Sequence, residues 1–340
     1  MAQRIAGRQD LGRADRALIA AAQRDFPLVA RPYQELAGRV GSNEEEVIAR
    51  LAALKQAGLI RRIGPVLEPR ALGLISELVA VEVDPSELDS VAAEVSAWPP
   101  VTHCYSRDHR VNLWFAAVAS DSFWFGAACA TAKSLPGVMG TWRLPALRRF
   151  KIGVRFDLDR RTGGEEAPPA SWTGGHAVTE DLDQQLLGAV QQDLPLCPAP
   201  FGLLASSAGI TEGELLETLR GWQESGLMRR YGALVNHLRL GFTANAMTVW
   251  LAPPDNIEQA ARWLSRSPQV SHCYERPAFP GFPHNLYAMV HGLSREECLR
   301  VVTALSEEGG IGVGAVLFSI REYKKSAPDY LSLLASRSRR

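Results

Sequence analysis

The sequence contains the same unit twice, and this duplication restricts the fold more than any other feature. When Asp15 is aligned with Asp183, the segment 15–73 matches 183–241 without a gap, and 21 of the 59 positions are identical. Unrelated segments of ordinary composition agree at only about 6% of positions. One inserted residue later, His103 falls on His272. We therefore expect two copies of one unit of about 150 residues, joined in tandem.

The first part of each half has the pattern of three short helices followed by a β-wing. In the first half, the helices are expected at 15–24, 33–40 and 44–57. Ser42 or Asn43 can cap the third helix, and Gly58 can end it. In the second half, Thr211 and Glu214 have the spacing of a capping box. The stretches GLIRRIGPVL and GLMRRYGALV follow as wings, so each half begins with a winged helix-turn-helix.

The second part of each half alternates strands and helices in the order β-α-β-β-α-β. This order is that of the ferredoxin-like split motif, so the chain is predicted to be an α+β protein that duplicates a winged helix-turn-helix plus a ferredoxin-like domain. A segment rich in Gly, Pro, Ser and Thr separates the halves. The expected domains are 1–70 and 182–238 (winged helix-turn-helix), 71–159 and 239–340 (ferredoxin-like), with 160–181 as the linker.

The helices in the position of DNA-recognition helices are acidic. The first carries Glu44, Glu45 and Glu46 in its first turn, and the second carries Glu212 and Glu214. Affinity for DNA depends on Lys and Arg against phosphate, and glutamates repel the duplex. The chain as a whole has 37 basic and 37 acidic residues. We therefore expect that the helix-turn-helix keeps its fold but does not bind DNA.

Two strands repeat the pattern His-Cys-Tyr-x-Arg. Because side chains alternate across a strand, Val101, His103, Tyr105 and Arg107 are predicted to share one face, with Cys104 on the other. In the second copy, the same alternation places Val270, His272, Tyr274 and Arg276 on one face. A row of His, Tyr and Arg offers a proton donor, an aromatic plate and a clamp for carboxylates. An exposed polar sheet face is the alternative interpretation.

Further candidate residues differ between the halves. The wings carry Arg61 and Arg62 in the first half, and Arg229, Arg230 and Tyr231 in the second, where His237 takes the place of Pro69. His109 lies in the turn after the first His-Cys-Tyr strand, and His284 lies beside the second. His291 is taken as a loop histidine that faces solvent. The halves have diverged, so any pair of sites is expected to be unequal.

The rest of the composition excludes some classes of protein. No apolar run reaches the roughly 20 residues that a membrane span needs, and the N-terminus lacks the apolar segment of a signal peptide. Five cysteines without a CxxC pair predict neither a disulfide framework nor a thiolate zinc site, and no metal site is predicted. We expect a cytoplasmic protein, with Cys104 and Cys273 as small buried apolar residues.

The stretches RRYGALVNHLRLGFTANAMTVW, HCYSRDHRVNLWF and HCYERP with NLYAMVHG resemble the sirohaem decarboxylases, which are related to the leucine-responsive/asparagine transcription regulators. The resemblance covers nearly the whole chain except the linker. It implies two subunits fused into one chain, ferredoxin-like sheets paired face to face, and removal of two acetate carboxyl groups from sirohaem on the way to haem d1 or, by an alternative route, haem. That family commonly has an aromatic residue where this chain has His284.

The substrate chemistry that this resemblance implies agrees with the candidate residues. Sirohaem is a planar polyanion, so its site needs cations and apolar walls. Loss of CO2 leaves a carbanion-like centre that must be protonated, and histidine is the natural donor near neutral pH. The predicted catalytic residues are His103, His272, His109 and His237; a histidine that ligates the substrate iron is an open alternative. The predicted substrate contacts are Arg62, Tyr105, Arg107, Trp114, Arg229, Arg230, Tyr231, Tyr274, Arg276, His284 and Tyr287.

Two other functions and several partners are left open by the sequence. A tetrapyrrole carrier or sensor would share every site feature except turnover, and a ligand-sensing transcription regulator would bind an operator. No cofactor is expected beyond the iron that sirohaem carries. A homodimer of the fused chain and contacts with other enzymes of haem d1 synthesis are compatible with the sequence, whereas neither DNA nor a membrane is expected as a partner.

Overall fold

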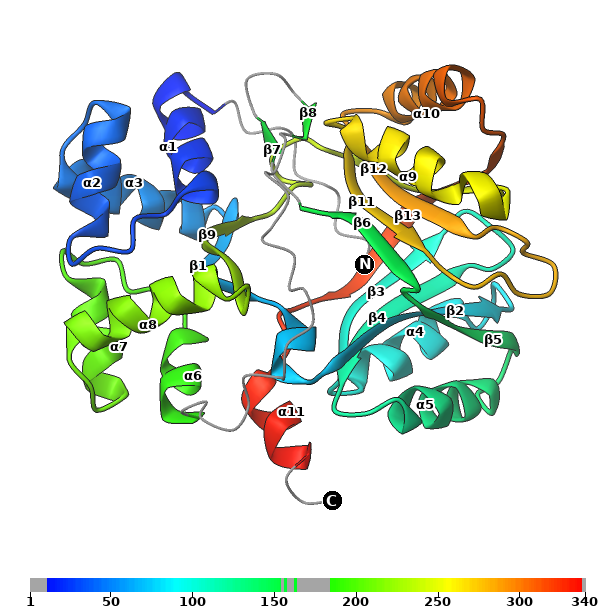
Figure 1. Ribbon diagram of the computed structural model, residues 1–340, viewed down its shortest axis with the longest axis horizontal. Coiled ribbons are helices and arrows are strands. Elements are labelled where there is room, and N and C mark those ends of the chain that lie inside the picture. Colours follow the sequence, from blue (N-terminus) through cyan, green and yellow to red (C-terminus); the bar gives the residue numbers. More distant parts are fainter. Residues whose placement is uncertain (1–10, 154–155, 158–161, 164–183, 338–340) are drawn as a thin grey trace. The chain divides into compact units, whose positions relative to one another are not determined.

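The computed structural model describes residues 11–153, 156–157, 162–163 and 184–337. The chain forms two compact units, and each unit takes one part from each half of the sequence. Unit 1 comprises the described residues of Met1–Leu72 and Arg155–Thr243, and unit 2 those of Gly73–Val154 and Ala244–Arg340. The α+β class and the duplicated architecture are confirmed, because both helix-turn-helix parts and both β-α-β-β-α-β parts are present (Figure 1).

Unit 1 contains the two winged helix-turn-helix parts. Its elements are α1 (Arg13–Arg24), α2 (Pro32–Val40), α3 (Glu44–Gln56), β1 (Ile60–Leu67), the 3-10 helix η1 (Pro69–Leu72), β7 (Phe156–Asp157), β8 (Thr162–Gly163), α6 (Gln184–Val190), α7 (Pro200–Ser207), α8 (Glu212–Glu224) and β9 (Met228–Val235). The wings β1 and β9 pair with each other in an antiparallel ribbon. The two helical parts are therefore joined through their wings.

The predicted signals at the helix ends are found where the sequence placed them. Asn43 is the cap of α3 and accepts the backbone N–H of Glu46 at 2.9 Å. Thr211 and Glu214 form the capping box of α8. Gly58 follows α3 with a positive φ of 68°, a conformation that glycine adopts without strain.

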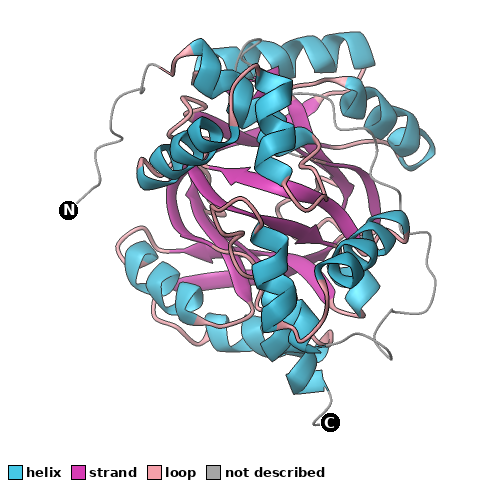
Figure 2. Ribbon diagram, turned by 90° about the vertical axis from the view of Figure 1, so that its left-hand side faces the viewer, coloured by secondary structure: helices cyan, strands magenta, loops and turns pink. Residues whose placement is uncertain are grey.

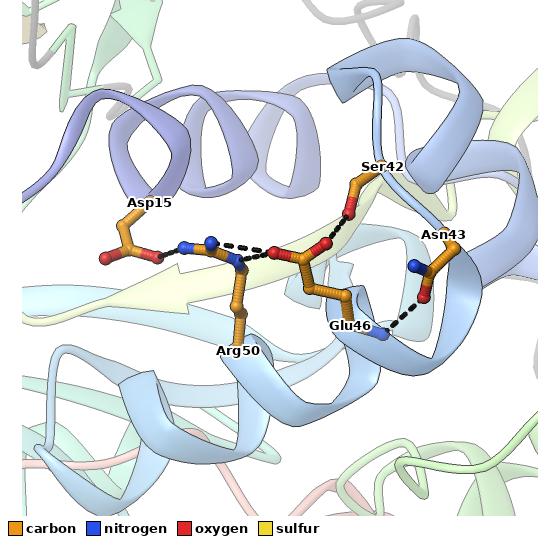
Figure 3. A network of polar contacts seen from close by, with 5 residues as sticks. All are labelled: Asp15, Ser42, Asn43, Glu46 and Arg50. Carbon is orange, nitrogen blue, oxygen red and sulfur yellow. Dashed lines mark hydrogen bonds and ion pairs between the residues drawn. The ribbon is translucent and has the colours of Figure 1, made fainter.

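The acidic turn of α3 also neutralises the only arginine of that helix. The guanidinium of Arg50 lies 3.0 Å from the carboxylate of Asp15 and 2.8 Å from that of Glu46 (Figure 3). Ser42 donates a hydrogen bond to the same Glu46 carboxylate at 2.7 Å, and Asn43 accepts from the Glu46 backbone. A phosphate would have to displace two carboxylates to reach Arg50. This helix is therefore a poor surface for a DNA backbone.

We expect the protein to bind duplex DNA no more tightly than the non-specific range of about 10⁻⁴–10⁻⁶ M at physiological salt. Fluorescence anisotropy with labelled duplexes over a range of salt concentrations measures this. The Glu45→Lys variant, which adds a positive charge to the first turn of α3, serves as a sensitivity control. Saturable submicromolar binding of one duplex by the unmodified protein would contradict the expectation.

Unit 2 contains both ferredoxin-like parts. The first supplies β2 (Ile75–Val83), α4 (Leu88–Ala97), β3 (Val101–Arg107), β4 (Leu113–Ala119), α5 (Phe123–Lys133), β5 (Val138–Pro145) and β6 (Arg148–Ile152). The second supplies β10 (Ala244–Trp250), the 3-10 helix η2 (Pro254–Asn256), α9 (Ile257–Arg266), β11 (Val270–Glu275), β12 (Leu286–Gly292), α10 (Arg295–Gly309), β13 (Val313–Lys325) and α11 (Tyr330–Arg337).

Nine strands of unit 2 form one sheet in the order β5-β2-β4-β3-β13-β10-β12-β11-β6. The long strand β13 pairs with β10 of its own half and continues along β3 of the other half. In the same way β6, which follows β5 after two residues, pairs with β11 of the other half. Each half thus adds a strand to the part of the sheet that the other half forms. The two strands at the ends of the sheet, β5 and β6, follow each other in the sequence.

The core of unit 2 has three layers of apolar side chains. One lies under α4 and α5 and contains Cys104, and one lies under α9 and α10 and contains Cys273. The third consists of residues from both halves, on the sheet faces turned away from the helices. The helices accordingly lie outside and the strands inside (Figures 1 and 2). The inner layer confirms that the two halves pack their sheets against each other.

Both repeated cysteines are buried apolar residues, as the sequence predicted. Cys104 and Cys273 have no exposed surface, and all five cysteines of the chain are free thiols. Burial raises the pKa of Cys104 to about 11 and that of Cys273 to about 12. Neither is therefore a thiolate at neutral pH, and neither is suited to act as a nucleophile.

Candidate active site

The predicted row of His, Tyr and Arg is present on β3. The rings of His103 and Tyr105 are nearly parallel, with an interplanar angle of 26° and centroids 6.3 Å apart. The guanidinium carbon of Arg107 lies 6.0 Å from the centre of the Tyr105 ring. Cys104 points the other way, into the helix-covered core. The alternation of a β-strand therefore places three groups with different chemistry on one face.

The second copy on β11 has the same geometry. His272 and Tyr274 are inclined by 24°, with ring centroids 6.1 Å apart. The guanidinium carbon of Arg276 lies 4.7 Å from the centre of the Tyr274 ring, close enough for a cation–π contact. We call these two rows the N-ladder (His103, Tyr105 and Arg107) and the C-ladder (His272, Tyr274 and Arg276).

The two valines predicted on the same faces are not part of the ladders. Val101 and Val270 belong to the helix-covered cores, together with the cysteines. In both halves a β-bulge separates the valine from the histidine, since two residues of the strand face one on its neighbour. The extra residue reverses the alternation, so this part of the prediction was wrong. The bulge residues are Thr102 and Ser271, and both bond to the neighbouring histidine.

Each arginine extends from its own half to a strand of the other half. Arg107 donates to the backbone carbonyl of Leu317 on β13 at 2.9 Å. Arg276 donates to the backbone carbonyl of Leu144 on β5. Both carbonyls belong to residues of the inner layer. The ladders therefore border the interior between the two halves of the sheet, where both halves of the sequence contribute side chains.

Arg107 is a buried cation. Its exposed fraction is 6%, and within the described residues no carboxylate forms an ion pair with it. The nearest acidic neighbour, Asp108, pairs instead with Arg295 at 2.7 Å. Burial lowers the pKa of Arg107 to about 10, which still leaves the group charged at neutral pH. A desolvated arginine without a carboxylate is a favourable place for an anionic group of a ligand.

His109 and His284 meet at one aromatic ring. The centroid of Phe282 lies 5.4 Å from that of His109 and 4.5 Å from that of His284, both in edge-on geometry. His109 accepts the backbone N–H of Val111 through Nδ1 at 3.0 Å. Burial lowers the pKa of both histidines, and each ring's pKa is lowered further by a neighbour, Arg110 for the first and His109 for the second. Both rings are therefore neutral at pH 7.

Trp114 and Tyr287 are part of this interior, and their predicted contact with the substrate stays a prediction. They are 1% and 2% exposed and belong to the inner layer. Trp114 satisfies its indole N–H by donating to the carbonyl of Val111 at 2.9 Å. The hydroxyl of Tyr287 is buried without a hydrogen bond, and burial raises its pKa. An unsatisfied buried hydroxyl is costly, and a polar group of a ligand could satisfy it.

Phe282 was not among the predicted site residues. This residue lies in the loop between β11 and β12, yet only 1% of it is exposed. Its ring centroid lies 5.9 Å from that of Trp114, 6.3 Å from that of Tyr287 and 4.8 Å from that of Phe279. Phe279 in turn stacks on Trp142 at 4.5 Å. Two phenylalanines within the ten-residue loop RPAFPGFPHN were the available signal, because loops seldom contain large apolar residues without burying them.

The prediction that His291 is a solvent-facing loop histidine was wrong. It lies on β12, not in a loop, and only 7% of it is exposed. Its Nε2 atom lies 2.8 Å from the hydroxyl of Ser271, which in turn lies 2.8 Å from Nδ1 of His272. The alternation of β12 was the signal that would have found it, since His291 shares a face with Tyr287 and Met289.

The wing arginines predicted as substrate contacts are in unit 1. Arg62 donates to the carbonyls of Gln191 at 2.8 Å and of Pro65 at 2.9 Å. Arg230 donates to the carbonyl of Gln23 at 3.2 Å. Arg229 lies 3.5 Å from the carbonyl of Leu67, at the limit of a hydrogen bond. The contacts with Gln191 and Gln23 connect the wings to the helical parts, whereas the other two stay within the paired wings. The role of the three arginines toward a substrate stays a prediction.

Tyr231 and His237 are likewise buried in unit 1. The ring of Tyr231 packs against Phe26 and Phe201 with centroid distances of 5.6 Å and 5.5 Å, and 3% of the residue is exposed. His237 is also 3% exposed and follows the wing β9. The packing of Tyr231 gives it a part in the core of unit 1, and the predicted catalytic part of His237 stays a prediction.

Two absences concern only the part of the chain that the structure describes. No group of three or more His, Cys, Asp or Glu side chains is placed to hold a metal ion there. In that same part, each helix is too short or too polar to cross a bilayer.

Two family models match the chain, each of them twice. The AsnC-like ligand binding domain matches residues 71–151 and 239–324. The Siroheme decarboxylase NirDL-like HTH domain matches residues 15–61 and 183–229. The matched segments recur in both halves, in the order that the duplication requires.

Curated and solved relatives agree with these matches. A protein named "Siroheme decarboxylase" from Hydrogenobacter thermophilus is 35% identical over 311 residues, which cover 91% of this chain and 92% of that protein. The "Siroheme decarboxylase beta subunit" of Methanosarcina barkeri is 42% identical and covers 43% of this chain but 97% of its own length. A crystal structure of the siroheme decarboxylase NirDL in co-complex with an iron-uroporphyrin III analogue superposes with a TM-score of 0.67, at 31% identity, over 96% of this chain and 97% of that chain.

Proposed function

The chain belongs to the sirohaem decarboxylase family, and we propose that it removes carboxyl groups from sirohaem without oxidation, as a carboxy-lyase. The observation that carries this proposal is the pair of ladders, which place His, Tyr and Arg on matching faces in both halves. A relative that corresponds to about half of the chain is named as a separate subunit. The fused chain therefore combines in one molecule two parts that exist separately elsewhere.

The product that we propose is didecarboxysirohaem, formed by converting two acetate side chains of the macrocycle into methyl groups. We place this product on the route to haem d1, with haem formation by an alternative route as the other use. Two ladders and two acetates suggest one ladder for each acetate, although one ladder that acts twice would give the same product.

Binding in this proposal depends on the ladder arginines and the aromatic walls. Sirohaem carries carboxylates around the edge of a flat apolar ring system. Arg107, which is buried, and Arg276, which is half-buried, would each hold a carboxylate, since a guanidinium that is partly or fully removed from water binds this group strongly. Trp114 and Tyr287 would contact the flat face, and the Tyr287 hydroxyl would gain a hydrogen-bond partner. Phe282 occupies this interior and has to move for a large ring to enter.

The proposed reaction breaks the bond between the acetate methylene carbon and its carboxyl carbon. The carboxyl group leaves as CO2, and the bonding electron pair passes into the conjugated macrocycle. A proton from His103 or His272 then adds to the methylene carbon and completes the methyl group. Electrons balance without any oxidant. Removing the carboxylate from water favours CO2 loss. His109 and His284, neutral and near Phe282, would complete the wall or ligate the substrate iron.

No cofactor besides the iron of the substrate is included in this proposal, because the macrocycle itself accepts the electron pair. We further propose that the reaction takes place in the cytoplasm, which suits five free cysteines. A homodimer of the fused chain and contacts with other enzymes of haem d1 synthesis stay predictions from the sequence.

Incubation of the purified protein with sirohaem under anaerobic conditions tests the proposal. Mass spectrometry is expected to find the macrocycle first with one CO2 lost and then with two. A carrier or sensor would change the absorption spectrum of sirohaem on binding and leave its mass unchanged. Unchanged sirohaem after prolonged incubation with folded protein would refute the enzyme function.

A further inference from the structure

The two ladders differ in how the histidine is held. In the N-ladder, His103 Nδ1 lies 2.9 Å from the hydroxyl of Thr102, and this hydroxyl donates to the backbone carbonyl of Ala116 at 3.2 Å. In the C-ladder, His272 Nδ1 lies 2.8 Å from the hydroxyl of Ser271. There the equivalent carbonyl, that of Met289, is 3.5 Å away, a marginal distance.

A second histidine takes the place of that carbonyl in the C-ladder. The hydroxyl of Ser271 lies 2.8 Å from Nε2 of His291, so His291, Ser271 and His272 form one connected chain. The strands β12 and β4 correspond residue by residue, and the position of His291 is occupied by Val118 in the first half. Valine cannot bond to a hydroxyl, so the first half cannot form this chain.

The chemistry of this hydrogen-bonded series of His291, Ser271 and His272 follows from the single proton of the Ser271 hydroxyl. When His272 is protonated, both of its ring nitrogens are donors, and Nδ1–H must donate to the Ser271 oxygen. The hydroxyl proton then points to Nε2 of His291, which can accept it only if His291 is neutral. A neutral His291 therefore supports the acid form of His272, which leaves the other nitrogen, Nε2, as the proton donor.

The surroundings of His291 keep it neutral. It is buried on the inner side of β12, opposite Asn245 of β10. Burial lowers its pKa to about 3, and the positive charges of Lys325 on β13 and Arg107 on β3 act in the same direction. Its folded pKa lies below the ordinary value near 6.5, so His291 remains an uncharged acceptor from neutral pH down to moderately acid pH.

We propose that His291 is a positioning residue for His272: through the Ser271 hydroxyl it orients the ring of His272 and stabilises its acid form, a support that the first half lacks. The proposal rests on the function proposed above for the direction of proton transfer, but not for the hydrogen-bonded chain itself. It makes the C-ladder the half-site that retains its acid to higher pH.

The test compares substitutions of the hydrogen-bonded residues His291 and Ser271 with conservative substitutions at the same positions and with a matched substitution in the first half. His291→Val introduces the residue of the first half, and Ser271→Ala removes the connecting hydroxyl. Both are expected to lower the pKa of His272 by about half a unit to one unit, the size of one ordinary hydrogen bond. His291→Gln and Ser271→Thr retain an acceptor and a hydroxyl, respectively, and are expected to restore most of the shift. Val118→Ala is the matched truncation in the first half.

Two measurements separate this proposal from the proposed function. Titration of the ¹⁵N-labelled histidines by NMR in the substrate-free protein reads the His272 ring directly, with its signals assigned by their loss in His272→Gln. The pH dependence of kcat/KM with sirohaem reads the same group during turnover, and its alkaline limb is expected to move to lower pH. A His272 titration that is unchanged in both His291→Val and Ser271→Ala overturns the inference, whatever the activity. A shifted titration in a protein without turnover supports the inference and refutes the enzyme function.

Discussion

His272→Ala is expected to lower the rate of sirohaem decarboxylation about 10²–10⁴-fold, the usual contribution of a positioned general acid. The ring of His272 is held over Tyr274 and bonded to Ser271, so its removal leaves the binding groups in place. We therefore expect kcat to fall more than KM rises. Single-turnover rates of CO2 loss, followed by mass spectrometry, measure the effect on the chemical step.

Substitution of His103, alone and together with His272, tests whether each ladder decarboxylates one acetate. If each ladder serves one acetate, His103→Ala stops the reaction after one CO2, and His103→Ala/His272→Ala stops it entirely. Cys273→Ala is the control, because Cys273 is the next residue along β11 but faces the helix-covered core. Full activity in both single variants would show that neither ladder histidine is the acid.

Arg107→Met is expected to lower kcat/KM for sirohaem about 10–100-fold, since a charge-assisted hydrogen bond contributes about 1.5–3 kcal/mol. The same change is expected to leave the free energy of unfolding unchanged or to raise it. Below pH 10 Arg107 is charged in the folded and the unfolded protein, so the cost of burying its charge is fully present at neutral pH. A pKa lowered to about 10 corresponds to a cost of about 3 kcal/mol for burying the charge. Arg107→Met removes this cost but also loses the hydrogen bond to the carbonyl of Leu317.

Urea unfolding at neutral pH and steady-state kinetics together test this prediction. Arg321→Met is the matched control, because Arg321 lies on β13 in an exposed ion pair with Asp89 and is expected to affect neither quantity by much. A loss of more than about 3 kcal/mol in Arg107→Met would show that Arg107 holds the sheets together. Unchanged kcat/KM would show that it does not contact the substrate.

Local chemistry and the repeat predicted much of the fold. The cap at Asn43, the capping box at Thr211 and the helix end at Gly58 are set by neighbouring residues, which the sequence displays directly. The ladders were predictable for the same reason, since a strand alternates its side chains from one residue to the next. The duplication strengthened each prediction, because a pattern found in one half had to fit the other.

Predictions that needed contacts across the chain were less successful. The bulge at Thr102 and Ser271 depends on how β3 and β11 register with their neighbours, so the faces of Val101 and Val270 were predicted wrongly. The burial of Phe282 depends on the opposite sheet, which contributes Trp114 from the other half of the sequence.

The sequence by itself determined that this chain is a duplicated α+β protein with acidic recognition helices and a His-Tyr-Arg row in each half. These properties follow from local periodicity, from charge and from the repeat. Only the tertiary structure decided that β13 and β6 cross into the opposite halves, that Arg107 ends on the carbonyl of Leu317, and that His291 bonds to Ser271. The reason is physical: strand pairing and hydrogen bonds between distant segments are satisfied only when the whole sheet closes, and no local pattern records which partner each group will find.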